Sequence, residues 1–253
     1  APAKASVALV FSYDAHWLFE AQPQGAAWSY SALVFEWYSA LRRFGLDIDI
    51  VPPAAPLSGY KAVFVPSLPI VDAAFVERVQ ASGALALFGP RTGSKTTSLT
   101  IPEGLAPGAL KALMPLAVTH VESFPADHRE AGSFNGGAVS GRIWLEHVET
   151  ALAPLAAGEG GGGLLYRNGK AFYLTTVPDH AFLGALVWSI LAEARVAMAP
   201  VDPDIRLRRR GDLVFAFNYG PEPRDVSALA GDAAFVLGAS IIEPAGVAAW
   251  RGD

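Results

Sequence analysis

Short apolar runs alternate with amphipathic segments through the N-terminal third of the chain, and this alternation narrows the possible folds more than any other feature. Residues 6–11 read SVALVF, a run typical of a strand covered on both faces. Apolar side chains recur at three- and four-residue steps from Tyr30 to Phe44, which predicts a helix that ends at Gly45. Further strands are predicted at residues 47–51, 61–65 and 84–88.

A second helix is predicted from Asp72, which can cap its first turn, to about Ser82. The resulting order of strand, helix, strand, strand, helix and strand favours an open, largely parallel α/β sheet. In such sheets a functional site lies beyond the carboxyl ends of the strands. Those ends lead here into residues 12–14, 66–69 and 89–95.

Weaker signals mark the segments outside this alternation. A polar loop is expected from residue 12 to about 27, and a glycine- and serine-rich loop at 131–141. Residues 147–157 are expected to be partly helical, with Pro154 interrupting the helix. The remaining predictions are a short helix at 107–114, a strand at 117–122, a hairpin at 164–176 turning at Asn168-Gly169, and a helix at 179–194 capped by Asp179.

The pattern changes after Pro200 and Pro203, where no helix-length periodicity follows. Short strand candidates separated by Gly, Pro and Asp occur at residues 205–209, 213–218, 226–229, 233–237 and 246–250. We therefore predict two domains, an α/β domain at 1–198 and a small antiparallel, β-sandwich-like domain at 199–253.

Charge and composition exclude several classes of function. The chain has 19 basic and 24 acidic residues, a net charge of −5 and no cysteine. Nucleic-acid binding needs a clustered positive field, which the brief basic run at 206–210 does not provide. No apolar run reaches the roughly 18 residues that span a bilayer, so no membrane partner is expected. The lack of cysteine removes disulfides, thiolate ligands and cysteine nucleophiles.

Two loops resemble nucleotide-binding motifs but lack the required context. Residues 89–96 read GPRTGSKT, in which Ser94 stands where a phosphate-binding loop has glycine before Lys95. A phosphate-ligand binder built on this loop is a weak alternative. Residues 158–163 fit G-x-G-x-x-G, yet they precede a predicted hairpin instead of joining a strand to a helix. We predict no cofactor and no cofactor-binding residue.

Catalytic and metal-ligating patterns are also lacking. Glu146 and Glu149 lie on one segment and are expected on a solvated face, whereas a glycosidase needs two carboxyl groups facing each other roughly 5–9.5 Å apart. No G-x-S-x-G nucleophile motif occurs. We predict no catalytic residue and no metal site, because no compact ligand pair is formed by His16, His120, His128, His147 and His180.

Aromatic residues are concentrated in the first loop and helix: Trp17, Trp28, Phe35, Trp37 and Tyr38. Those on the apolar stripe of the helix are expected in the core. Those off the stripe could form an exposed apolar patch, which often marks a subunit contact.

The order of segments resembles family 42 glycoside hydrolases, specifically their trimerisation domain. The resemblance rests on SVALVFSYDAHW, WYSALRRFGLDIDIVPP, LSGYKAVFVPSLPIVD and SGALALFGPRTGSKT, followed by APGALKALMPLAVTHVESF. The segments IRLRRRGDLVFAFNYGPEP and IIEPAGVAAW resemble the family's small C-terminal β domain. The match covers nearly the whole chain in order, with residues 123–160 matching poorly.

This resemblance implies a flavodoxin-like or class I glutamine amidotransferase-like open sheet with a small antiparallel β domain. It implies a homotrimer of a retaining β-galactosidase whose two catalytic glutamates lie on a (β/α)8 barrel of about 250 residues N-terminal to this module. We therefore expect a non-catalytic portion of a cytoplasmic enzyme, with the β-galactoside bound mainly by the barrel. The alternative is a stand-alone amidotransferase-like scaffold or binding protein, which the upstream reading frame would distinguish.

Overall fold

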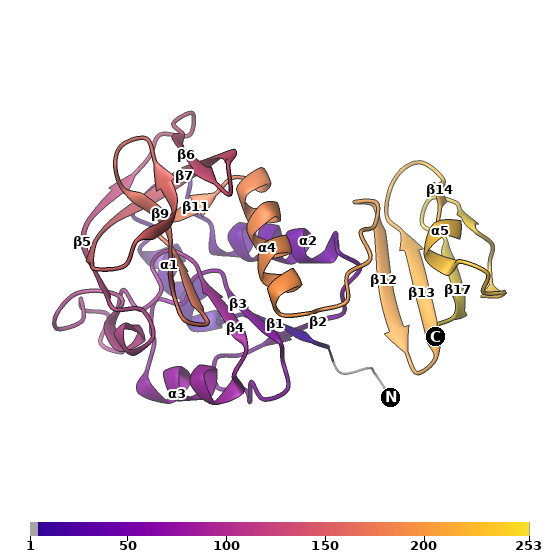
Figure 1. Ribbon diagram of the computed structural model, residues 1–253, viewed down its shortest axis with the longest axis horizontal. Helices are drawn as coiled ribbons and strands as arrows, with labels where there is room; N and C mark the ends of the chain where they lie inside the picture. The colour runs from indigo at the N-terminus through magenta and orange to yellow at the C-terminus, as the bar shows by residue number, and fades with distance from the viewer. Residues whose placement is uncertain (1–4, 253) are drawn as a thin grey trace.

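The computed structural model describes residues 5–252, which form a larger lobe and a smaller C-terminal lobe (Figure 1). The larger lobe is built on an 11-stranded sheet of order β11-β7-β6-β8-β9-β10-β4-β3-β1-β2, with β5 also paired to β7. The predicted parallel strands are confirmed as neighbours in this sheet. They are β1 (Val7–Val10), β2 (Ile48–Val51), β3 (Ala62–Val65) and β4 (Leu85–Phe88), and β10 (Ala171–Leu174) continues the parallel region beside β4.

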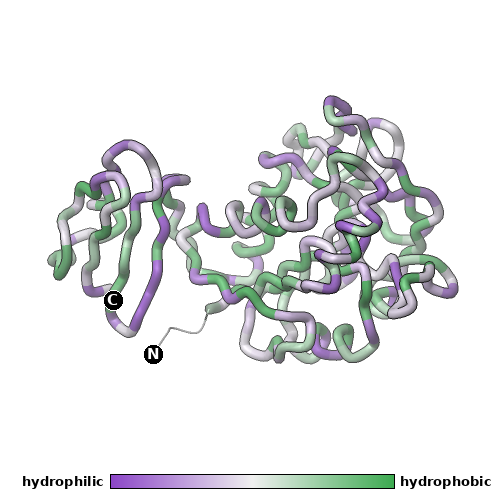
Figure 2. The backbone as a smooth tube through the Cα atoms, turned by 180° about the vertical axis from the view of Figure 1, so that it is seen from behind, coloured by the Kyte–Doolittle hydropathy of each residue, from purple (hydrophilic) through white to green (hydrophobic). Residues whose placement is uncertain are grey.

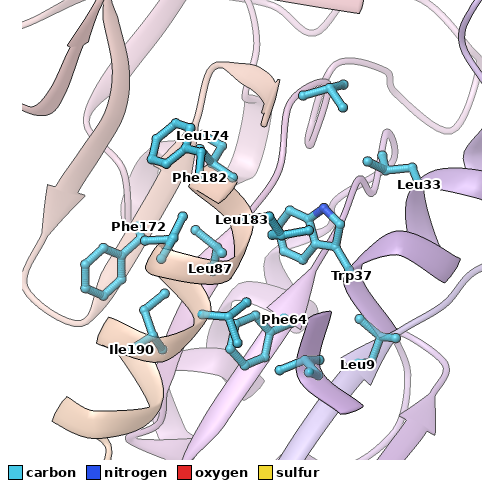
Figure 3. Packing of buried hydrophobic residues seen from close by; sticks show 14 of the residues in the cluster. Leu9, Leu33, Trp37, Phe64, Leu87, Phe172, Leu174, Phe182, Leu183 and Ile190 are labelled. Atoms are coloured by element: carbon cyan, nitrogen blue, oxygen red, sulfur yellow. The ribbon is translucent and has the colours of Figure 1, made fainter. Parts of the chain in front are cut away.

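Helices cover both faces of this parallel region. On one face lie α1 (Tyr13–Ala21), α2 (Tyr30–Arg42) and α4 (His180–Glu193). On the other lie α3 (Ala73–Ser82) and the short 3-10 helix η1 (Gly108–Ala112). Alternate strand residues serve the two faces, since Leu9 packs on the first face and Val10 on the second. Figure 3 shows the first core, in which Trp37 of α2 and Leu183 of α4 meet above Phe64 of the sheet.

A side-chain hydrogen bond caps the N-terminus of each of the four long helices, α1, α2, α3 and α4. Asp72 and Asp179 accept hydrogen bonds from the backbone N–H groups of Phe75 and Phe182, each over 2.7 Å, as the sequence predicts. The predicted polar loop after β1 is wrong in its first half. Ser12 caps α1 there, and α1 turns Ala15, Leu18 and Phe19 into the core. The exposed aromatic residues Tyr13 and Trp17 interrupt the apolar period of this short helix, so the sequence does not reveal it.

Antiparallel strands extend the sheet where the sequence predicts a loop and a partial helix. Residues 131–141 contribute to β6 (Glu130–Phe134) and the long strand β7 (Gly137–Thr150), joined at Asn135-Gly136 with φ angles of 50° and 78°. Residues 147–157 contain no helix and lie largely in β7 and β8 (Pro154–Gly158). Asn-Gly tolerates the left-handed region, so the turn signal was present within a segment whose composition resembles a loop.

The remaining strands of the large sheet are β5 (Leu116–Ser123), β9 (Gly163–Asn168) and β11 (Thr176–Pro178). The predicted hairpin at 164–176 is confirmed as β9 and β10. Its pairing of Asn168 with Ala171 places the two-residue loop at Gly169-Lys170, one residue later than predicted. None of the helices among residues 5–252 combines the length and apolar character needed to cross a bilayer.

The C-terminal lobe stands apart from the larger lobe in Figure 2, and it has its own sheet and core. Its sheet order is β12-β13-β17-β15, from β12 (Ile205–Arg210), β13 (Leu213–Asn218), β17 (Val247–Arg251) and β15 (Phe235–Leu237). The short strands β14 (Arg224–Asp225) and β16 (Ile241–Ile242) pair separately. The predicted strand at 226–229 is wrong, because Ser227–Ala230 form the single-turn helix α5. Asp225 accepts a 2.8 Å hydrogen bond from the Ser227 N–H just before this turn.

Backbone and side-chain hydrogen bonds join the two lobes. The N–H groups of Ala199 and Val201 donate to carbonyls of residues 44 and 43 over 3.0 and 2.9 Å. The buried Arg42 guanidinium donates to the Leu46 carbonyl over 2.5 Å and to the Leu207 carbonyl of β12 over 2.7 Å. The end of α2 therefore holds the first strand of the C-terminal lobe.

Candidate functional site

The loop after β4 lies where an open α/β sheet commonly places its site. Its backbone passes so close to the loop after β3 that a Cβ on Gly89 would lie 1.8 Å from the Pro66 carbonyl oxygen. Thr92 Oγ1 donates to the Gly89 carbonyl over 2.7 Å and accepts from the Leu68 N–H over 3.2 Å. No helix begins in residues 89–107, so the loop lacks the helix N-terminus on which a phosphate-binding loop depends.

Arg91, at the centre of this loop, is 2% exposed and has a left-handed φ of 64°. Its guanidinium donates to the Pro23 carbonyl over 2.7 Å, the Gln22 carbonyl over 3.1 Å and the Gln24 Oε1 over 3.0 Å. Burial lowers its pKa to about 10, against the opposing charge of Glu146. The side chain therefore fixes the segment after α1 to the carboxyl end of β4.

Three aromatic rings surround the same guanidinium. Its Cζ atom lies 4.3 Å from the ring centroid of Phe19, 4.5 Å from that of Trp28 and 4.8 Å from that of Trp144. A desolvated cation over an aromatic face gains roughly 2 kcal/mol or more. The burial of Trp28 is explained by this contact and by packing on Phe19.

Glu146 of β7 is buried beside the Arg91 loop, so the prediction of a solvated carboxylate is wrong for this residue. It accepts from the Arg91 N–H over 2.8 Å, the Tyr173 hydroxyl over 2.8 Å and the Trp144 indole N–H over 3.3 Å. Burial raises its pKa from 4.5 to about 7, although all three hydrogen bonds oppose the rise. Burial and the neighbouring carboxylate raise the pKa of Tyr173 as well.

A break in the strand pairing turns Glu146 inward. Ile143 has a left-handed φ of 67°, and the pairing of β11 shifts from Leu145 to Arg142 at this point. Trp144, Leu145 and Glu146 are consequently buried in succession, against the alternation expected of a strand. Glu149 is exposed on the same strand. The two carboxyl groups therefore do not face each other across a cavity, and Glu146 is positioned to stabilise the loop after β4.

The other sequence-predicted features serve local structure. Residues 158–163 run from the end of β8 through a turn to the start of β9, and no helix follows them. In the basic run, Arg208 and Arg209 approach Asp47 with N–O distances of 3.9 and 3.5 Å. The Arg209 guanidinium also donates to the Gly45 carbonyl over 3.2 Å. Two of the four arginines in this run thus contact residues of the larger lobe at the junction between the lobes.

The structure brings some of the histidines together and leaves others apart. His16 lies 3.3 Å from Glu20 within α1, and His128 packs against Phe124 with ring centroids 4.2 Å apart. His180 begins α4. His120 and His147 meet across β5 and β7, close to Glu122, although 27 positions separate them in the sequence. A search for compact motifs could not find this group, because strand pairing alone brings it together.

Exposed aromatic residues mark a candidate contact surface. On α1, Tyr13 and Trp17 are 65% and 61% exposed, and on α2 Phe35 is 65% exposed. Trp17 and Leu99 also line an apolar hollow beside the carboxyl ends of β1 and β3. By contrast, Trp37 is fully buried, as its place on the apolar stripe predicts.

Residues 5–197 match the family model described as the β-galactosidase trimerisation domain. The chain belongs to this family. Residues 204–252 match the model described as the β-galactosidase C-terminal domain. These matches confirm the resemblance inferred from the order of segments.

Similar proteins and solved structures support the same family assignment. The chain is 48% identical to β-galactosidase BgaA from Thermus sp over 249 residues, covering 98% of this chain and 38% of BgaA. It is 33% identical to β-galactosidase BgaH from Haloferax lucentense, again covering 38% of that protein. Among solved structures, β-galactosidase from the psychrophilic Marinomonas ef1 superposes with a TM-score of 0.93 at 34% identity, covering 100% of this chain and 38% of that one. The chain thus spans about two fifths of the length of these β-galactosidases.

Proposed function

We propose that this chain is the non-catalytic trimerisation and C-terminal portion of a retaining β-galactosidase that hydrolyses terminal β-D-galactosides. The observation that carries the proposal is coverage, since the chain aligns almost completely with β-galactosidases yet covers 38% of each. A catalytic barrel of about 250 residues would account for much of the remaining length.

None of the described side chains, we further propose, takes part in glycoside hydrolysis. Retaining hydrolysis needs one carboxyl group as nucleophile and a second as acid, about 5–5.5 Å apart on either side of the scissile bond. Glu146 is the candidate with a raised pKa, but it is enclosed by three hydrogen-bond donors, one of which is the Trp144 indole N–H. Such a group cannot reach a sugar without breaking the loop that it supports.

The structural role that we propose is self-association as a homotrimer. The family description supports this assembly, and the exposed aromatic side chains of Tyr13, Trp17 and Phe35 offer apolar area for a subunit contact. We propose no nucleic-acid or membrane partner and a cytoplasmic location. The β-galactoside would be bound mainly by the barrel.

We also propose a relationship for the large sheet and a boundary between the two domains. The large sheet, with its parallel region between helical layers, is proposed to be related to flavodoxin-like and class I glutamine amidotransferase-like sheets. The domain boundary is proposed between residues 198 and 199. The separate matches of residues 5–197 and 204–252 and the separate core of the C-terminal lobe support that boundary.

The test is incubation of the 253-residue chain with a nitrophenyl β-D-galactoside, using a full-length β-galactosidase as the positive control. We expect no nitrophenol release above buffer for the chain alone. The assignment of a non-catalytic role would be overturned by appreciable nitrophenol release that persists after the chain is purified again. The same release would have to be lost when one Asp or Glu among residues 5–252 is substituted.

A further inference from the structure

Strands β5 and β7 bring two imidazoles and one carboxylate together on the larger lobe. His120 pairs directly with His147 in the strand register, and Glu122 lies two positions along β5 from His120. Residues two apart in a strand share a face, which places Glu122 beside the same imidazoles. One ligand atom from each of the three residues lies within 4.8 Å of the others.

These three groups suit a divalent transition metal. Neutral imidazole nitrogen and carboxylate oxygen are zinc ligands at about 2.0–2.2 Å, and tetrahedral geometry then places ligand atoms roughly 3.4 Å apart. The His147 Nε2 and Glu122 Oε1 atoms are already 2.5 Å apart, and the two histidine ring centroids are 5.3 Å apart. An ion held by all three groups would replace the hydrogen bond between His147 Nε2 and Glu122 Oε1 and would move those two atoms apart to roughly 3.4 Å.

The surroundings leave the group accessible to an ion and to water. The side chains of His147 and Glu122 are 38% and 45% exposed. A Cβ added at Gly162 of the β8–β9 turn would lie 4.0 Å from His147 Nδ1. A fourth coordination position would thus be filled by water, as is usual when a protein supplies three zinc ligands.

Anchoring on paired strands gives the group a fixed spacing. The Thr119 hydroxyl donates to the His147 carbonyl over 3.3 Å, which adds a second link between β5 and β7 near the bulge at residues 118–120. Sites built on strands hold their geometry better than sites on loops. An ion there would bridge two strands of the antiparallel extension.

We propose that His120, Glu122 and His147 form a binding site for a divalent first-row transition-metal ion, with Zn²⁺ as the test ion, which crosslinks β5 to β7. The proposal is independent of the proposed role in a β-galactosidase. It requires only the strand pairing and the three side chains.

The test compares Zn²⁺ binding by calorimetry between the 253-residue chain and single variants. His147→Gln and Glu122→Gln each remove one ligand, and we expect each to weaken binding at least tenfold. The matched control is His16→Gln, which breaks the His16–Glu20 pair on α1 and leaves the three proposed ligands intact. The Zn²⁺ affinity of His16→Gln should equal that of the unaltered chain.

Thermal unfolding and Co²⁺ absorption supply independent measurements. Zn²⁺ at about 100 times its dissociation constant should raise the Tm of the unaltered chain by roughly 5 °C or more, and should not raise that of His147→Gln. Co²⁺ should give visible absorption bands that the same variant loses. Without metal, all variants should melt near the unaltered chain, because the replaced side chains are partly exposed. Binding that is unchanged in both ligand variants, or undetectable up to roughly 1 mM Zn²⁺, would overturn the site.

Discussion

Replacing Glu146 by glutamine should remove a pH-dependent loss of stability from the folded chain. Glutamine keeps the size of the side chain and an oxygen that accepts the Arg91 N–H, but it carries no titratable charge. The pKa of Glu146 is about 7 in the folded chain against an ordinary value of 4.5. The difference of about 2.5 pKa units corresponds to roughly 3 kcal/mol in the free energy of unfolding.

The direction in which the free energy of unfolding changes with pH follows from the number of protons that Glu146 binds in the folded and the unfolded chain. Below about pH 4.5 the carboxyl group is protonated in both the folded and the unfolded chain, so its titration costs nothing. Between about pH 4.5 and 7 the unfolded chain loses the proton while the folded chain keeps it, so the free energy of unfolding falls as pH rises. Above about pH 7 both forms are ionised, and the loss stays near 3 kcal/mol.

The assay is urea unfolding, followed by tryptophan fluorescence, at several values between about pH 5 and 8. Glu146→Gln should be about as stable as the unaltered chain at the acid end and about 3 kcal/mol more stable at the alkaline end. Glu149→Gln on the same strand is the matched control, because Glu149 is exposed, and it should follow the unaltered chain throughout. Parallel pH profiles for the unaltered chain and Glu146→Gln would refute the reasoning.

Four further substitutions test other parts of the fold. Arg91→Met should cost about 3–5 kcal/mol in urea unfolding, because two carbonyls lose their donor and Glu146 loses a nearby positive charge. Gly169→Ala should lower the unfolding free energy by about 1 kcal/mol because its φ is 56°, whereas Gly184→Ala within α4 should raise it by about as much. Arg42→Met removes the donor to the Leu207 carbonyl, so limited proteolysis near residues 197–204 should become faster.

Local periodicity was sufficient to predict helices α2, α3 and α4 and the parallel strands of the large sheet. The apolar stripe of α2 and the caps Asp72 and Asp179 act within a few residues, so the sequence alone contains them. Strands β6, β7 and β8 were missed, partly because the turn at Asn135-Gly136 lies in a glycine- and serine-rich stretch that equally suits a loop. Their pairing depends on contacts between segments that the pattern does not connect.

The buried charge cluster was missed for a different reason. Glu146 and Arg91 are 55 positions apart, and Arg91 and Pro23 are 68 apart. The bulge at Ile143 also breaks the alternation of side chains between the two faces of β7. Counting positions along the strand therefore assigns Glu146 to the wrong face. One signal was available in the sequence, since a single acidic residue within the apolar run IWLEHV suggests a buried, partnered carboxylate.

In a domain that we propose to be non-catalytic, the buried Arg91 and Glu146 side chains can serve to position other elements of the fold. The Arg91 guanidinium fixes residues 22–24, which follow α1, and the carboxylate of Glu146 fixes the loop after β4 to β7. A subunit contact through Tyr13 and Trp17 of α1 needs that helix to be held rigidly against the sheet. Apolar packing of similar volume could supply as much stability, but hydrogen bonds of fixed direction specify one arrangement of α1, β4 and β7.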